Sequence, residues 1–251
     1  MKKTHKFGIE MPKTVAEALA LDKKNGNTLW ADAIAKEMKE VKVAFRKLKD
    51  GEQIPIGYQR VPLHMVFDVK MEGFRCKARL VAGGHVTKPP ATVTYASVVS
   101  CETVRIALTL AAALHELEEK VGGIMNAYIT VPVTEKIWTV LGPEFGAEDQ
   151  GKKAIIARSL YGLKSSGAAF CNHLALCMRH LEFEPCLADP DLWMKPEVRP
   201  EDGHKYCAYI LLFVDDVLVV HHSAEEILLI IGGKTKLSRM LTRRSFEMDV
   251  N

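Results

Sequence analysis

Two adjacent aspartates, Asp215 and Asp216, interrupt an apolar, β-branched stretch, YILLFVDDVLVV, at residues 209–220. Two interpretations of this stretch are open. Asp is a common turn residue, so the pair can simply form the polar tip of a β-hairpin. Alternatively, the two carboxylates hold a divalent metal ion at the tip of a buried hairpin, because Mg²⁺ prefers oxygen ligands.

Three further stretches carry residue types that suit a nucleotide. KARLVAGGH places Lys77 and Arg79 on one face of a predicted strand, because side chains two apart on a strand point the same way. These cations suit a triphosphate, and a solvated strand face is an equally good interpretation. In SLYGLKSSGAAF, a glycine turn and a lysine precede a helix start, where free N–H groups can bind phosphate. In MNAYITVP the one large aromatic residue, Tyr128, is by itself an ordinary core residue.

Composition bounds the class of protein. The chain has 251 residues, of which 48% are hydrophobic and 26% charged, so we expect a globular protein with one large domain or two small ones. A net charge of +3 permits a nucleic-acid partner without requiring one. The N-terminus lacks the apolar core of a signal peptide, and no apolar run reaches the roughly 18 residues of a membrane span. We therefore expect a soluble, intracellular protein, cytoplasmic or nuclear, with no membrane partner.

Two other ligand sites are disfavoured by spacing. The six cysteines include no C-x-x-C pair, which argues against zinc and for reduced thiols. The GGKT stretch at residues 232–235 suggests a phosphate loop, but Leu228 stands where that motif requires glycine.

The elements that must position these residues follow from hydrophobic periodicity. Residues 28–48 predict an amphipathic helix with a buried stripe formed by Trp30, Ile34, Met38, Val41 and Phe45. Residues 62–83 predict a hairpin that turns at Glu72 and Gly73.

The rest of the chain mixes helices and strands. We expect a helix over 101–119 capped by Ser100, a strand over 124–133, a loop over 142–151, a strand over 153–160 and a helix from Ser166 to about Leu181. A Pro/Asp-rich linker precedes the aspartate hairpin, and a helical, basic segment follows it. Because the order is not a regular βαβ alternation, the fold class predicted is α+β.

Ordered motifs along the chain resemble the reverse transcriptase domain of copia-type (pseudoviral) LTR retrotransposons. The resemblance covers roughly residues 28–222, and the motifs occur in the family's order: LWADAIAKEM, FDVKMEGFRCKARLVAGGH, YASVVSCETVRIAL, NAYITVP, EKIW, GPEFG, SLYGLKSSGAAF, ADPDLW and FVDDVLVV. So many collinear matches favour the metal-binding interpretation of the aspartate hairpin.

The resemblance implies the fingers and palm of a right-hand polymerase, with the thumb and RNase H absent from this stretch. It divides the chain into an N-terminal extension at 1–27, fingers at 28–98 and 132–165, palm at 99–131 and 166–222, and a divergent tail at 223–251.

The resemblance also implies a reaction and a set of site residues. Such polymerases transfer a nucleotidyl group from a dNTP to a primer 3′-hydroxyl, with two Mg²⁺ ions clamping the attacking and leaving oxygens. Asp215 and Asp216 would be the catalytic metal ligands, and Tyr128 would lie under the nucleotide sugar. Nucleotide contacts would also come from Lys77, Arg79, Tyr161, Gly162, Lys164 and Ser165.

One departure from the family pattern concerns the metal site itself. The family has D-x-x-N-A-Y, and here Asn126, Ala127 and Tyr128 match while Gly123 replaces the aspartate. Nearby acids, Glu118, Glu119 and Glu135, lie at the wrong register. Losing one preorganised charge-stabilising group costs on the order of 10²–10³ in rate, so we expect little polymerase activity. In the loop, Ser165 and Gly167 also replace the family's usual glutamine and proline.

We therefore expect an RNA-directed DNA polymerase by descent, in a truncated and catalytically impaired copy. Its partners would be an RNA or DNA template-primer and dNTP, together with other segments of the retrotransposon polyprotein. An alternative stays open: a non-catalytic remnant of the element that binds nucleic acid, or assembles with intact element proteins, through its basic fingers.

Overall fold

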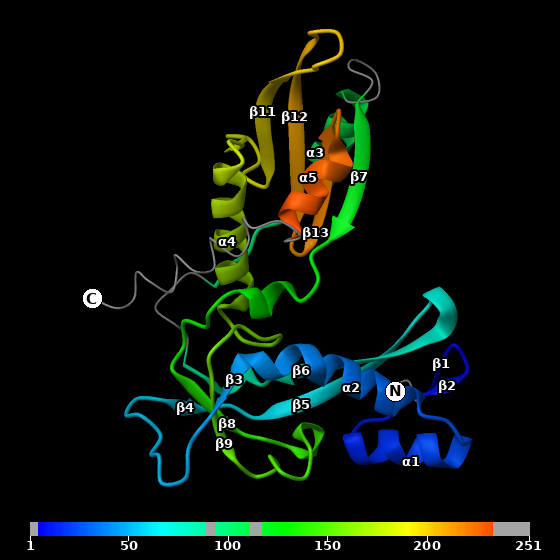
Figure 1. Cartoon of the computed structure of the whole chain (residues 1–251), viewed down its shortest axis with the longest axis vertical. Helices are drawn as coiled ribbons and strands as arrows, with labels where there is room; N and C mark the ends of the chain where they lie inside the picture. The colour runs from blue at the N-terminus through cyan, green and yellow to red at the C-terminus, as the bar shows by residue number, and fades with distance from the viewer. Residues whose placement is uncertain (1–4, 89–93, 111–116, 233–251) are drawn as a thin grey trace. The chain divides into compact units, whose positions relative to one another are not determined.

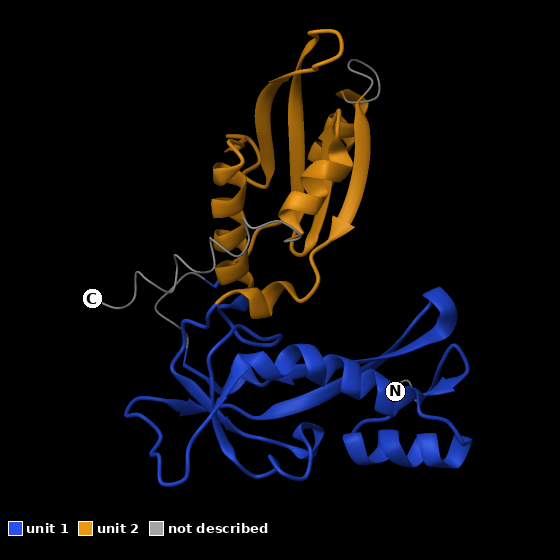
Figure 2. Cartoon of the chain, viewed as in Figure 1, with its two compact units in different colours: residues 1–94, 132–166 blue, residues 95–131, 167–251 orange. Residues whose placement is uncertain are grey.

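The computed structural model describes residues 5–88, 94–110 and 117–232, and the chain forms two compact units. Figure 2 shows unit 1, residues 1–94 and 132–166, and unit 2, residues 95–131 and 167–251. The chain thus passes from one unit to the other near residues 94, 131 and 166. The boundaries predicted from sequence between fingers and palm are residues 98, 131 and 165. The names fingers and palm stay a prediction.

Unit 1 combines two hairpins, a four-stranded sheet and two helices (Figure 1). The sheet has the order β3-β9-β8-β4, and the two hairpins are β1–β2 and β5–β6. Its elements are β1 (His5–Lys6), β2 (Ile9–Glu10), α1 (Val15–Asn25), α2 (Leu29–Val41), β3 (Phe45–Lys47), β4 (Gln59–Arg60), β5 (Leu63–Lys70), β6 (Arg75–Ala82), β8 (Ile137–Val140) and β9 (Lys153–Ile156).

Helix α2 buries the apolar stripe that its sequence predicts, with one exception. Trp30, Ile34, Met38 and Val41 are all buried. Trp30 packs edge-on against Phe67 of β5, with the ring centroids 5.5 Å apart. The predicted helix is too long, however: α2 ends at Val41, and Phe45 lies half-buried at the start of strand β3, where it pairs with Ile156 of β9. Pairing with a distant strand therefore overrides the helical period at this end.

The N-terminus of α2 is capped from the preceding helix. Asp22 of α1 is buried, and its two carboxylate oxygens accept hydrogen bonds from the backbone N–H groups of Trp30 (3.1 Å) and Ala31 (2.8 Å). Thr28, at the N-cap position, makes no side-chain bond to the helix backbone. Asp22 therefore satisfies two N–H groups that a helix start leaves without partners.

Asp22→Ala is expected to lower the free energy of unfolding by about 1–3 kcal/mol, because one buried and one partly buried N–H group lose their acceptor. Urea denaturation monitored by circular dichroism would measure this loss. Thr28→Ala is the matched control and should change stability by well under 1 kcal/mol. A loss of equal size for both variants would contradict the assignment of the cap to Asp22.

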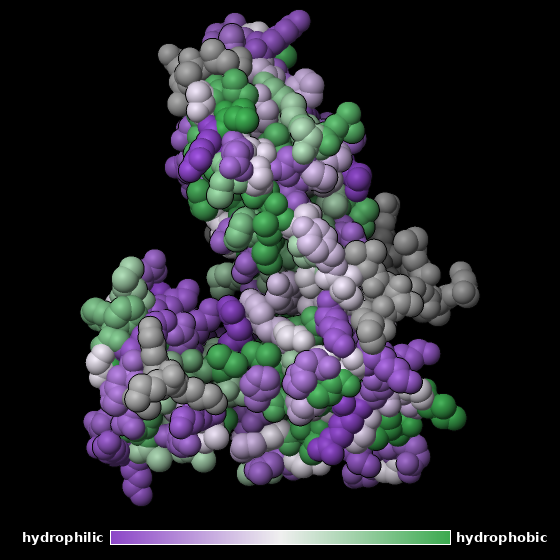
Figure 3. Space-filling model, turned by 180° about the vertical axis from the view of Figure 1, so that it is seen from behind, coloured by the Kyte–Doolittle hydropathy of each residue, from purple (hydrophilic) through white to green (hydrophobic). Residues whose placement is uncertain are grey.

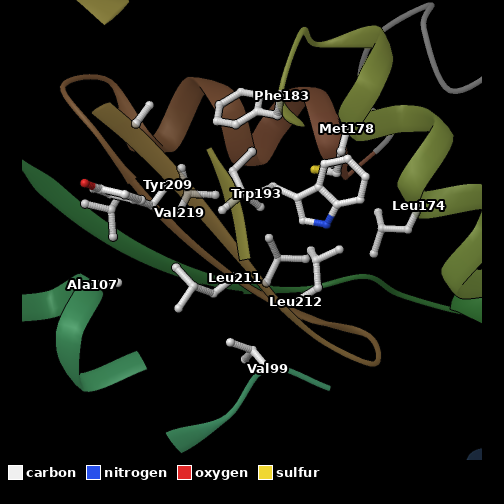
Figure 4. Close-up of a cluster of buried hydrophobic side chains, with 14 of the residues drawn as sticks. Val99, Ala107, Leu174, Met178, Phe183, Trp193, Tyr209, Leu211, Leu212 and Val219 are labelled. Carbon is white, nitrogen blue, oxygen red and sulfur yellow. The ribbon is translucent and has the colours of Figure 1, made fainter. Parts of the chain in front are cut away.

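Unit 2 is built on an antiparallel five-stranded sheet in the order β10-β11-β12-β13-β7. Its elements are α3 (Cys101–Leu110), β7 (Glu118–Gly123), the 3-10 turn η5 (Ala127–Thr130), α4 (Ser166–His180), β10 (Glu184–Pro185), β11 (Leu192–Val198), β12 (Lys205–Phe213), β13 (Asp216–His221) and α5 (Ala224–Ile231). In Figure 4, Leu174 and Met178 of α4 point toward Trp193 of β11, within one buried apolar cluster.

Several predictions for unit 2 are confirmed. Helix α4 begins at Ser166 and ends at His180, and β12 and β13 form the hairpin around the aspartates. Ser100 caps α3, because its Oγ accepts a hydrogen bond from the N–H of Thr103 at 3.1 Å. Strands and helices occur in mixed order, so the α+β class is confirmed.

Three predictions for unit 2 are wrong. The strand expected over 124–133 is replaced by the 3-10 turn η5, and the strand lies just before it, at β7. The end of the helix predicted over 101–119 is also wrong, because Glu118 and Glu119 belong to strand β7. Residues 111–116 of that prediction lie outside the described residues. The expected linker before the aspartate hairpin contains strand β11, which pairs along its length with β12.

The segment after the aspartate hairpin begins with helix α5, which packs on β7 and β13. The predicted basic tail beyond residue 232 and most of the GGKT stretch lie outside the described residues. All six cysteines are unbonded thiols. Among the described residues, no helix is both long and apolar enough to cross a membrane.

Candidate functional site

The aspartate hairpin closes with a two-residue turn, Val214 and Asp215, between β12 and β13. Phe213 pairs with Asp216 at the last position of the ladder. Val214 has φ +56°, a conformation that a β-branched residue rarely adopts and that stores strain on the order of 1–3 kcal/mol. This turn leaves Asp215 half-buried and Asp216 exposed at the end of the sheet.

Gly123 lies directly beside the aspartate pair. It is the last residue of β7 and pairs with Asp216, and the N–H of the next residue, Ile124, donates to the carbonyl of Asp215 at 2.7 Å. A Cβ atom built on Gly123 would stand 3.2 Å from Oδ1 of Asp216. A side chain at position 123 would therefore project toward the Asp216 carboxylate.

The other acids of β7 cannot take this place. Glu118 and Glu119 pair with His221 and Val220, at the opposite end of the β7–β13 ladder from Gly123. In the parts of the chain that the structure describes, no three His, Cys, Asp or Glu side chains are grouped as metal ligands. The site thus offers two adjacent carboxylates and a bare third position.

Tyr128 belongs to the same unit but not to a strand. It lies in η5, which follows Asn126 in a left-handed conformation at φ +57°. Its half-buried ring packs edge-on against Phe170 of α4, with the centroids 6.1 Å apart. Its predicted position under the nucleotide sugar stays a prediction.

In unit 1, Lys77 and Arg79 lie on the half-exposed face of β6, as the strand period predicts. The alternate residues Ala78 and Leu80 are buried. Opposite Lys77 on β5 is Asp68, and the guanidinium carbon of Arg79 lies 3.9 Å from the ring centroid of Tyr161. Arg79 and the loop 161–165 are therefore brought together, although they are far apart in sequence.

The loop 161–165 is interlocked with the end of β6 and the residues that follow it. The N–H of Ala82 donates to the carbonyl of Tyr161 at 2.8 Å. Gly162 has φ +89°, and a Cβ there would stand 2.1 Å from the carbonyl oxygen of Ala82, while a Cβ on Gly84 would stand 2.4 Å from the carbonyl oxygen of Gly162. Only glycine fits at these two positions, because backbone packs on backbone.

The last two loop residues predicted to contact nucleotide also have partners inside the protein. Lys164 Nζ donates to the carbonyl of Thr87 at 2.5 Å. Ser165 donates through its N–H and its hydroxyl to the carboxylate of Glu135. Both residues therefore hold the loop in place, and nucleotide contact by either one stays a prediction.

Sequence reasoning missed two acids that position these groups. Glu135, whose register excluded it from the metal site, accepts two hydrogen bonds from Ser165 and so holds the end of the loop 161–165. Glu37 of α2 accepts a hydrogen bond from the N–H of Leu80 at 2.9 Å, one position after Arg79 on β6. Burial raises the pKa of Glu37, and this effect outweighs the lowering by the Leu80 N–H, Arg79 and Lys77. Neither role carries a local sequence signal, because both partners are distant along the chain.

Glu37→Gln is expected to stabilise the chain at neutral pH. Because its pKa is raised in the folded state, Glu37 costs stability progressively as the pH rises from its ordinary value of 4.5 through the raised value. The free energy of unfolding of the variant should therefore exceed that of the natural chain by an amount that grows between pH 4.5 and 7. Urea titrations at several pH values would measure this difference. The exposed control Glu148→Gln should show no such growth, and a gain that is flat with pH would contradict the prediction.

The predicted site residues form two groups, one in each unit. Unit 1 holds Lys77 and Arg79 with the loop residues Tyr161, Gly162, Lys164 and Ser165. Unit 2 holds the aspartate pair, Gly123 and Tyr128.

Comparison with known proteins gives one family. Residues 49–247 match the model of the family described as reverse transcriptase (RNA-dependent DNA polymerase). No curated protein matches the chain. A solved structure of the foamy viral protease-reverse transcriptase, in complex with double-stranded DNA, is similar at 14% identity and a TM-score of 0.44. The match covers 84% of this chain and 29% of that one, so the chain spans under a third of that structure's length. By the family match, this chain belongs to the reverse transcriptase (RNA-dependent DNA polymerase) family.

Proposed function

We propose that this chain is the reverse transcriptase domain of a copia-type retrotransposon, an RNA-directed DNA polymerase by descent whose metal site is impaired. The single observation that carries the impairment is the pairing of Gly123 with Asp216. A side chain at 123 would stand against the Asp216 carboxylate, so the missing aspartate of the D-x-x-N-A-Y motif would have faced that group. The copia-type assignment rests on the collinear motifs and on the family match.

In this proposal unit 1 corresponds to fingers and unit 2 to palm. Lys77 and Arg79 would bind the triphosphate of a dNTP, because both lie on the half-exposed face of β6. Tyr161 supports Arg79 by stacking under its guanidinium group, and Glu135 and Thr87 hold the loop that carries Tyr161. Template-primer would be the nucleic-acid partner, as the polymerase family implies.

The residues present do not fit a two-metal site. Asp215 and Asp216 offer carboxylate oxygens of the kind that Mg²⁺ prefers, but Gly123 contributes no side-chain oxygen to bridge two ions. The natural chain would therefore support the two-metal reaction poorly. What its own residues can do is bind: the cations of β6 attract phosphate groups whether or not chemistry follows.

A second candidate function follows from the same observation. With the metal site impaired and the basic face of β6 intact, the chain would serve as a nucleic-acid-binding or assembly module of the element. Both candidate functions use the same fold. Polymerase activity requires the aspartate pair, whereas nucleic-acid binding or assembly does not.

The experiment that tests the proposal measures binding and synthesis together. We expect the natural chain to bind an RNA/DNA primer-template with an affinity that falls as salt rises, and to extend the primer in Mg²⁺ only at trace level. Asp215→Asn should leave binding unchanged. Efficient extension by the natural chain would contradict the impairment, and absence of salt-dependent binding would contradict both candidate functions.

A further inference from the structure

Two exposed phenylalanines from different hairpins contact each other in unit 1. Phe7 lies in the turn between β1 and β2, and Phe74 lies in the turn between β5 and β6; these two hairpins lie side by side (Figure 1). The ring centroids are 5.7 Å apart, yet the residues are 49% and 56% exposed. Met71, in the same turn as Phe74, is 72% exposed. We refer to Phe7, Met71 and Phe74 as the aromatic tip.

The backbone holds both aromatic rings outward at a cost. Phe7 has φ +51° and Phe74 has φ +46°, conformations that are unfavourable for bulky side chains. Gly8 and Gly73, their neighbours, also have positive φ, so the two turns are tight. Strain of this kind typically persists at functional sites. Neither phenylalanine offsets the strain by entering the core, so packing alone does not account for the pair.

Cations surround the aromatic tip. Lys6 Nζ lies 5.6 Å from the ring centroid of Phe7 and forms an ion pair with Asp68. Lys70 and Arg75 are exposed and pair directly across the β5–β6 ladder. Like charges in that arrangement destabilise a hairpin. Glu72 lies 4.0 Å from Arg75, but both side chains are largely exposed, so this pair offsets little of the repulsion.

The aromatic tip and its neighbouring cations combine the two kinds of group that bind single-stranded nucleic acid. Unpaired bases stack on aromatic rings, and the phosphates between them are bound by Lys and Arg. In a duplex the base faces are stacked on one another, so a duplex has no free face for Phe7 and Phe74. Figure 3 shows hydrophobic and hydrophilic side chains intermixed over the surface of unit 1.

We propose that the aromatic tip and the cations Lys70 and Arg75 bind a single-stranded segment of nucleic acid. One base stacks on the Phe7–Phe74 pair, and the flanking phosphates contact Lys70 and Arg75. The contact relieves the repulsion between these two cations. The inference rests on the proposed function, in which a template is the partner. It adds binding residues at the tip of the β5–β6 hairpin, beyond Lys77 and Arg79 on β6.

The test is fluorescence anisotropy of a labelled single-stranded RNA 12-mer with the full chain, without metal or dNTP. Replacing both phenylalanines by Ala should weaken binding at least about fivefold, because stacking of one base contributes roughly 1–3 kcal/mol. Replacing both by Tyr should keep the affinity within about twofold, since the ring is retained. Ile56→Ala, an exposed apolar truncation elsewhere in unit 1, is the matched control and should have no effect.

The cations have a separate readout. Neutralising Lys70 and Arg75 to Gln should reduce the slope of log affinity against log salt by roughly 1.4, at about 0.7 for each phosphate contact on a single strand. The control variant neutralises the exposed Lys23 and Lys49 of the same unit and should change the slope by much less.

Three results would overturn the inference. One is unchanged RNA affinity in the double Ala variant, and another is no RNA binding by the natural chain. The third is a self-association, seen by sedimentation, that the double Ala variant abolishes while RNA binding persists; the surface would then join two copies of the chain. The assay contains neither metal nor dNTP, so a negative result says nothing about the metal site. The metal site is tested separately, by primer extension with Gly123→Asp.

Discussion

Gly123→Asp is expected to raise Mg²⁺-dependent primer extension on an RNA template by at least about 10²-fold over the natural chain. The reason is local geometry: the new side chain would start 3.2 Å from Oδ1 of Asp216, beside Asp215. The variant would then carry carboxylates at positions 123, 215 and 216, where the natural chain has two. Restoring one preorganised charge-stabilising group is worth on the order of 10²–10³ in rate, and a bridging metal ligand is such a group.

The same substitution has a signature that does not depend on activity. Without metal, a third carboxylate next to Asp215 and Asp216 adds like-charge repulsion, so the variant should melt at a lower temperature than the natural chain. Mg²⁺ binding to the folded state should reverse this loss, because a ligand that binds only the folded state stabilises it. The rise in Tm with added Mg²⁺ should therefore be larger for Gly123→Asp than for the natural chain.

Two matched variants separate charge from shape. Gly123→Asn has nearly the same volume as Asp without the charge, and it should neither extend primers nor show the enhanced Mg²⁺ effect on Tm. Asp216→Asn, added to Gly123→Asp, should return extension to the natural level. If Gly123→Asp binds primer-template normally and still fails to extend the primer, the missing carboxylate does not explain the lack of polymerase activity.

Elements whose signals are local could be predicted from the sequence. The stripe of α2 and the start of α4 at Ser166 follow from helical periodicity and from the glycine turn before that helix. The β5–β6 hairpin follows from two apolar runs around Glu72 and Gly73. The aspartate hairpin follows from β-branched runs on either side of a polar tip. In each case propensity, period and turn residues agree.

Strand β7 shows why other elements could not be predicted. Its sequence, EEKVGG, has no apolar alternation and only one good strand former, Val121, and most of its residues are exposed. It is a strand because it lies at the edge of the sheet and pairs with β13. Long-range pairing of this kind overrides local propensity. Strand β11, which contains Pro196 and follows an Asp/Pro-rich stretch, is explained in the same way by its pairing with β12.

The candidate site shows the same division. The residues of the aspartate hairpin and the shared face of Lys77 and Arg79 could be found from spacing. What holds them could not: Glu37 reaches β6 from α2, and Glu135 reaches Ser165 across 30 positions. The interlock of Gly84 with Gly162 is equally invisible in sequence, because each glycine is explained only by the other segment's backbone.

Gly162→Ala is expected to destabilise unit 1 by roughly 3 kcal/mol or more. An L-residue in the left-handed region costs roughly 1–2 kcal/mol, and φ is +89° here. The new Cβ would also meet the Ala82 carbonyl oxygen at 2.1 Å and a Val81 methyl at 2.7 Å, so the loop must move away from β6. Overpacking of this kind adds roughly 1–3 kcal/mol. Because the loop carries Tyr161, its displacement should also release Arg79.

Gly57→Ala separates these two contributions. Gly57 has nearly the same φ, +86°, but a Cβ there would have nothing within 4 Å. That variant should therefore lose only the conformational part, roughly 1–2 kcal/mol. Hydrogen exchange locates the difference: the N–H of Ala82, which donates to Tyr161, should lose protection in Gly162→Ala and keep it in Gly57→Ala. Equal losses of stability in the two variants, with Ala82 still protected, would mean that the close backbone contact between β6 and the loop does not hold Tyr161 and Arg79 in place.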